Sequence, residues 1–99
     1  MSRQEREEIV HLCDAIRATH GCEAEYLNYI VRVREPVMGQ GQQEVFVQCF
    51  RLIGHPAAKR CYVWKQPEAN GTKIVTVLEL PPVDSAKSAV KFSLNGTAT

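Results

Sequence analysis

Apolar positions near the N-terminus follow the period of a helix. Those that recur at spacings of three and four residues are Ile9, Leu12, Cys13 and Ile16. This spacing predicts an amphipathic helix. Ser2 and Glu5 have the spacing of a capping box, and Gly21 is suited to the position just past a helix end. We therefore expect one helix between Ser2 and Gly21.

From Tyr26 onward, apolar and polar residues alternate in four segments, which is the pattern of β-strands. These segments are 26–35, 44–53, 60–66 and 73–80. Glycine, proline and asparagine lie between them, at Gly39-Gln-Gly41, Gly54-His-Pro56 and Asn70-Gly71, and Pro81-Pro82 ends the last one. The segment 85–94 then predicts a second helix, capped by Asp84 or Ser85, with a weak apolar stripe and with Lys87 and Lys91 facing away from it.

The order helix, four strands, helix, with short connections, predicts an α+β fold. We expect a four-stranded antiparallel meander sheet flanked by an N-terminal and a C-terminal helix (α-β-β-β-β-α). Residues 1–94 form a single domain in this interpretation, and residues 95–99 form a frayed tail.

The pairing of the strands predicts that both faces of the sheet are apolar. Pairing across the Gly39 loop places Arg34 opposite Val45 and Arg32 opposite Val47, and a turn at Asn70-Gly71 places Trp64 opposite Val77. We expect both helices to cover the face that carries Phe50, which leaves the other face open. The residues expected to form this open interaction surface are Arg32, Arg34, Val45, Val47, Arg60, Tyr62, Trp64, Val75 and Val77.

Composition and charge narrow the classes of function. The chain has 99 residues, of which 44% are hydrophobic and 23% charged, and a formal net charge of +1. These values fit a globular domain, whereas a generic polyanion binder usually has a clear basic excess. The N-terminus is charged and no apolar run has the length of a membrane span, so we expect a cytoplasmic protein that does not bind membranes and whose four cysteines are free thiols.

Histidine and cysteine are common in metal sites and at catalytic nucleophiles, but their spacing in this chain favours neither kind of site. His11 and Cys13 point in nearly opposite directions on a helix, and His20 and Cys22 lack a second pair of ligands, so we expect no metal and no cofactor. A Cys/His-dependent enzyme is the least favoured class, because Cys61 alternates to the face opposite Arg60 and is expected to be buried. We expect no catalytic residue.

The segment GHPAAKRCYVW (54–64) is where the main functional hypotheses diverge. As structure alone, it is a corner with a locally hydrogen-bonded His55, followed by a strand. As an anchor, it offers Arg60, Tyr62 and Trp64, the residue types that most often dominate protein interfaces. We therefore expect a non-enzymatic module that binds another protein or self-associates, for example as a homodimer. The alternative is an RNA-binding module that uses the same basic and aromatic sheet surface.

Three segments of the chain, HGCEAEY, LIGHPAAKRCYVW and VLELPPVDSAKSAV, carry a resemblance. They resemble segments of a group of short, stand-alone bacterial proteins of unknown function, in which GHPxAxRxYxW and LExPPVDS occur. The resemblance extends from His20 to Val90. It implies a bacterial, intracellular, single-domain protein and supplies no activity.

Overall fold

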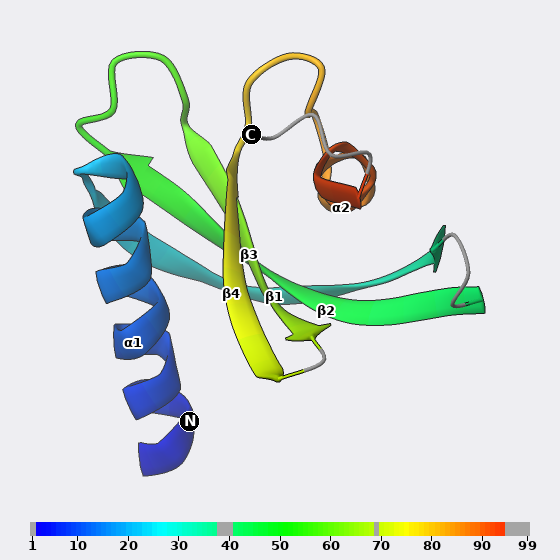
Figure 1. The fold of residues 1–99 in the computed structure, drawn as a ribbon. Helices are drawn as coiled ribbons and strands as arrows, with labels where there is room; N and C mark the ends of the chain where they lie inside the picture. The colour runs from blue at the N-terminus through cyan, green and yellow to red at the C-terminus, as the bar shows by residue number, and fades with distance from the viewer. Residues whose placement is uncertain (1, 38–40, 69, 95–99) are drawn as a thin grey trace.

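A computed structural model describes residues 2–37, 41–68 and 70–94 of the chain. Its elements, in chain order, are α1 (Arg3–His20), β1 (Glu23–Val37), β2 (Gly41–Ile53), β3 (Arg60–Glu68), β4 (Gly71–Leu78) and α2 (Ala86–Leu94). The expected α-β-β-β-β-α fold is confirmed, with all strands antiparallel in the order β1-β2-β3-β4 (Figure 1). The expected tail at residues 95–99 lies outside the described residues.

Both helices begin at hydroxyl side chains that accept backbone N–H groups. The Ser2 hydroxyl accepts the Glu5 N–H at 3.1 Å, and the Ser85 hydroxyl accepts the Ser88 N–H at 3.2 Å. Gly21 ends α1 in the left-handed conformation (φ 73°) and donates its N–H to the Arg17 carbonyl. The capping residues expected from the sequence are therefore confirmed, because each satisfies helix-end groups that have no partner within the helix.

The register between β1 and β2 differs by one residue from the expected one. Val37 pairs with Gly41, and this closing pair places Val33 opposite Val45 and Val31 opposite Val47. The expectation that Arg34 and Arg32 would occupy these positions is wrong. Since a slip of one residue exchanges the two faces of a strand, the two arginines lie on the opposite side of the sheet from Val45 and Val47.

The pairing of β1 with β2 also contains a bulge. Tyr26 lies opposite Phe50 and Ile30 opposite Gln48, so residues 27–29 face the single residue Cys49. Asn28, at the centre of this bulge, has a φ of 63°. An asparagine tolerates this left-handed conformation better than most residues, which explains how the long strand continues past the irregularity.

The β3–β4 hairpin turns one residue earlier than expected. Glu68 pairs with Gly71, so Tyr62 lies opposite Val77 and Trp64 lies opposite Val75. The expected pairing of Trp64 with Val77 is wrong by two residues. Because a shift of two leaves every side chain on its original face, the expected faces of Tyr62 and Trp64 are unaffected.

The two helices cover opposite faces of the sheet. On one face, which we call the α1 side, Leu12 and Ile16 of α1 pack in a cluster with Phe50, Cys61 and Val63. The opposite face, the α2 side, packs against α2 in a second cluster whose buried members are Val33, Val45, Val47, Cys49, Tyr62, Trp64, Val77, Val83, Ala86, Ala89 and Val90. The expectation that both helices share one face is wrong. A sheet that is apolar on both faces buries most surface when each face receives its own helix.

Beyond β3 and β4, the outer parts of β1 and β2 extend as a two-stranded arm. β3 pairs with β2 only over Gln48–Arg51, whereas β1 and β2 pair with each other as far as Val37 and Gly41. Figure 1 shows this arm extending past β3 and β4 below α2, with α1 at the opposite end of the sheet. Within residues 2–37, 41–68 and 70–94, α2 therefore lies on one side of the outer arm and neither helix lies on the other.

Candidate interaction surface

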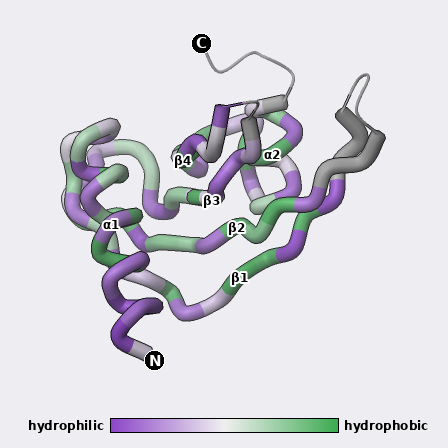
Figure 2. The backbone as a smooth tube through the Cα atoms, turned by 60° about the horizontal axis from the view of Figure 1, so that its bottom comes forward, coloured by the Kyte–Doolittle hydropathy of each residue, from purple (hydrophilic) through white to green (hydrophobic). Residues whose placement is uncertain are grey.

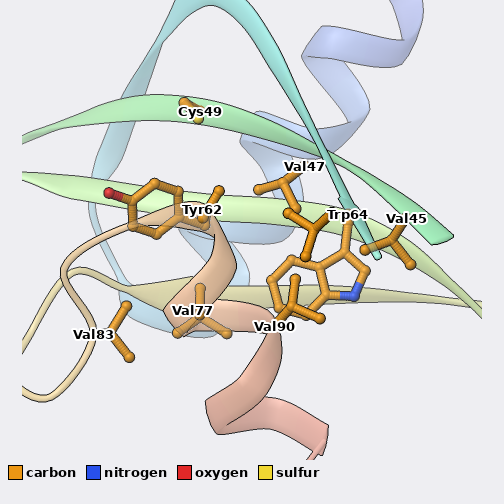
Figure 3. Close-up of a cluster of buried hydrophobic side chains, with 11 residues drawn as sticks. Val45, Val47, Cys49, Tyr62, Trp64, Val77, Val83 and Val90 are labelled. Carbon is orange, nitrogen blue, oxygen red and sulfur yellow. The ribbon is translucent and has the colours of Figure 1, made fainter. Parts of the chain in front are cut away.

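Five of the residues expected on an open sheet face are buried beneath α2. They are Val45, Val47, Tyr62, Trp64 and Val77 (Figure 3). The Trp64 side chain is 1% exposed, and its indole N–H donates to Gln66 at 3.0 Å. The prediction that these residues form an exposed surface is wrong, because α2 occupies the position expected for a partner.

The other four residues of the expected surface are divided between the two sides of the sheet. Val75 is half-buried against the α2-side core, and Arg60 is exposed on that side beside a hollow that Tyr62 also lines. Arg32 and Arg34 lie on the α1 side of the arm. The sequence therefore grouped residues that the fold does not bring to one surface.

The α1 side of the arm carries an exposed apolar pair that the sequence analysis missed. Phe46 is 56% exposed and Ile30 is 54% exposed. Arg32 lies directly opposite Phe46, and Ile30 is the diagonal neighbour of Phe46 across the β1–β2 ladder, within reach of an aromatic side chain. Figure 2 shows that hydrophobic stretches of both strands continue along the arm beyond α1.

The sequence did contain a signal for this pair. Phe46 alternates with Phe50 and Leu52 on one face of β2. Of these three side chains, α1 buries Phe50 and Leu52 but not Phe46. Phe46 therefore lies on the part of the face that the helix does not reach. The length of sheet that a helix covers depends on the angle and position at which it crosses the strands. The alternation of apolar and polar residues along a strand does not predict either.

Charged side chains border the apolar pair at the outer end of the arm. Arg34 Nε lies 2.6 Å from a carboxylate oxygen of Glu44, and Arg32 Nε lies 3.8 Å from the same oxygen. We call the five residues Ile30, Arg32, Arg34, Glu44 and Phe46 the arm surface. Its composition, an apolar centre with a charged rim that includes arginine, is typical of protein interfaces.

Next to the arm surface is a notch between the first half of α1 and the sheet. It encloses about 190 Å³ and is lined by Glu5, Glu8, Ile9, Tyr26, Ile30 and Gln48. Ile30 belongs to both the notch and the arm surface, so the two are continuous. Two carboxylates from α1 line the notch, and one of them, that of Glu8, also forms an ion pair with Lys65.

Titratable side chains gather on the α2 side around a hollow of about 320 Å³. Tyr29, Cys49, Arg60 and Lys87 contribute to its lining. Burial raises the pKa of the Cys49 thiol, and interactions with the Tyr29 hydroxyl and with Arg60 offset this only in part. A raised pKa favours the protonated thiol of Cys49 over the thiolate, which is the nucleophilic form.

His55 and Cys61 are both engaged within the fold. The His55 ring accepts the N–H groups of Ala57 and Ala58 through Nδ1, at 3.0 and 2.8 Å, so its expected local hydrogen bonding is confirmed. Burial in the α1-side core raises the pKa of Cys61 to about 12. His55 is occupied in stabilising the corner before β3, which is a structural function.

Among residues 2–37, 41–68 and 70–94, no three His, Cys, Asp or Glu side chains come together as a metal site would require. In the same ranges, neither helix combines the length and the apolar character needed to cross a bilayer.

Comparison of the chain with protein-family models, with curated proteins and with solved structures finds no match. The resemblance to short bacterial proteins therefore stays a prediction. The fold defines an α+β domain with a helix on each face of one sheet, and its function has to be inferred from its surface.

Proposed function

We propose that this protein is a non-enzymatic interaction module that self-associates through its arm surface. The observation that carries the proposal is the exposure of Phe46 and Ile30 as neighbours on one sheet face, with more than half of each side chain in water. Full burial of a phenylalanine or isoleucine side chain contributes about 1.5 to 3 kcal/mol, so covering the exposed half of each would contribute roughly 1 kcal/mol. A partner that covers the α1 side of the arm gains this free energy.

The chemistry of the cysteines supports an interaction function over an enzymatic one. All four cysteines are free thiols, and burial raises the pKa of Cys13, Cys49 and Cys61. Free thiols of this kind are typical of a reducing compartment, so a cytoplasmic location belongs to the same proposal.

The association is tested by gel filtration with light scattering across the micromolar range. We expect a mass above the 11.1 kDa of one chain, and a return to that mass in a Phe46→Ser variant. Ile53→Ser is the matched control, because Ile53 is 51% exposed at the other end of β2, outside the arm surface. A wild-type protein that remains monomeric at the highest concentration would contradict the proposal.

The RNA hypothesis is an alternative outcome of the same experiment. Tyr62 and Trp64 are buried and have no free ring face for base stacking, whereas Phe46, opposite Arg32 on the arm, is exposed. Glu44 already engages Arg32 and Arg34. Salt-sensitive binding of mixed RNA by a monomer, lost in Phe46→Ser, would replace self-association with RNA binding.

A further inference from the structure

We infer that the partner of the arm surface is a second copy of this chain, and that Phe46 of each copy enters the notch of the other. This inference rests on the proposed function and names the partner and the contact. One face of the molecule carries both an exposed aromatic ring and, beside it, a hollow with a partly apolar lining.

The notch is large enough for a phenyl ring, and three of its six lining residues are apolar or aromatic. Its volume of about 190 Å³ exceeds that of an engineered cavity of about 150 Å³ that binds benzene. Ile9, Tyr26 and Ile30 supply an apolar lining. The ring of Phe46 is therefore a suitable occupant, and the Phe46 of the same chain projects from the neighbouring position on the arm.

Two arginines and one carboxylate, that of Glu44, surround the ring and give it a net positive border, whereas two carboxylates line the notch. Arg32 lies directly opposite Phe46 on the ladder, and Arg34 follows on the same face. Glu5 and Glu8 line the notch. When Phe46 of one copy enters the notch of the other, the arginines of the first approach the carboxylates of the second. This complementarity favours a second copy of the chain over an unrelated partner.

Of the four side chains Arg32, Arg34, Glu5 and Glu8, three already form ion pairs within their own chain. Glu44 contacts both arginines and Lys65 contacts Glu8, whereas no ion pair of Glu5 occurs within the described residues. The new contacts between copies extend the existing ion pairs and remove none of them. Glu5 is the carboxylate most available to the partner.

A two-fold axis satisfies all of these contacts at once. In an isologous dimer, a contact from the first copy to the second is repeated from the second to the first. Ile30 borders both the notch and Phe46, so an axis that passes by Ile30 brings the two Ile30 side chains together and places each Phe46 over the partner's notch. The contact closes on itself and produces a dimer.

Charge reversal tests this arrangement. We expect Glu5→Arg and Arg32→Glu each to weaken self-association by at least about tenfold, since each reversal places like charges together twice in a symmetric dimer. An equimolar mixture of the two variants should form a mixed dimer, because both of its contacts are attractive. Lys91→Glu, on the exposed face of α2, is the matched control for reversal of a charge and should leave association unchanged.

The outcomes separate the inference from the proposed function. If the wild-type protein forms oligomers but the mixture of the two variants does not, the contact described here is wrong and self-association stands. A monomeric wild-type protein would overturn both. Circular dichroism and Trp64 fluorescence verify that each variant is folded before the mixture is made.

A cross-linking measurement covers the case in which a charge-reversed variant does not fold. In the Ile30→Cys variant, the two new thiols lie together at the axis, so a short bismaleimide should join two chains with high yield. Ile53→Cys, equally exposed and far from the axis, should give the wild-type background. Equal yields from the two variants would contradict the placement of the axis.

Discussion

Cys61 illustrates how strongly a single buried side chain can respond to its surroundings. It lies wholly inside the α1-side core, where burial raises the pKa of its thiol from 9.0 to about 12, with a smaller contribution from Cys22. Because the folded chain holds this proton more tightly than the unfolded chain, Cys61 links stability to alkaline pH.

We predict that stability falls as the pH rises above the ordinary pKa of the thiol. The contribution of Cys61 is fully present below about pH 9 and is lost between about pH 9 and 12, at about 1.4 kcal/mol per pH unit for one proton. Urea midpoints measured between neutral pH and about pH 11 should decline less steeply in Cys61→Ala. Tyr62, whose pKa is also raised, mainly by burial, adds a further decline that this variant retains. Identical slopes for the two proteins would contradict the assignment.

At the scale of the element, β1 depends on the conformation of Asn28. Its φ of 63° lies in the left-handed region, at the centre of the bulge that offsets β1 from β2. We predict that Asn28→Gly retains or increases stability, whereas Asn28→Val lowers it by about 1 to 2 kcal/mol, since a β-branched residue is strained there. Chemical denaturation of the two variants measures this difference. A valine variant as stable as the glycine variant would indicate a regular strand without the bulge.

The elements themselves were predictable because their signals are local. Ser2, Glu5 and Gly21 define the ends of α1 through contacts within a few residues, and alternation defines the four strands. The pairing of β1 with β2 was not predictable in the same way. It depends on the closing pair Val37–Gly41 and on the bulge at Asn28, and neither changes the local pattern of apolar and polar residues.

The candidate site was harder to predict because it depends on which helix covers which face. The alternation correctly placed Tyr62 and Trp64 on the face away from α1. This face is buried because α2 packs on it, and Phe46 is exposed because α1 does not extend over it. Both are consequences of packing between distant segments, so the exposed apolar pair Ile30 and Phe46 lies on the face opposite to the expected one.

At the scale of the whole molecule, one sheet serves two cores. β2 and β3 contribute alternate residues to each, with Phe50, Cys61 and Val63 on the α1 side and Val47 and Trp64 on the α2 side. Neither core can lose its packing without disturbing strands that the other requires. The fold should therefore unfold as one unit despite the short length of α2.

We predict that two probes of unfolding report the same transition. Trp64 fluorescence monitors the α2 side, and far-ultraviolet circular dichroism monitors all helices and strands, with α1 as the longest helix. Their urea midpoints should coincide, and Ile16→Ala, which leaves a cavity on the α1 side, should shift both by the same amount. A fluorescence transition at lower urea than the dichroism transition would mean that α2 detaches first.

The alternation of the two cores along β3 also bears on how the gene for such a chain can vary. Cys61 and Val63 face α1 while Tyr62 and Trp64 face α2, so inserting or deleting one codon within this strand would present each helix with the side chains shaped for the other. Related chains should consequently differ in length at their turns and ends, and keep a constant residue count through the middle of β2 and β3.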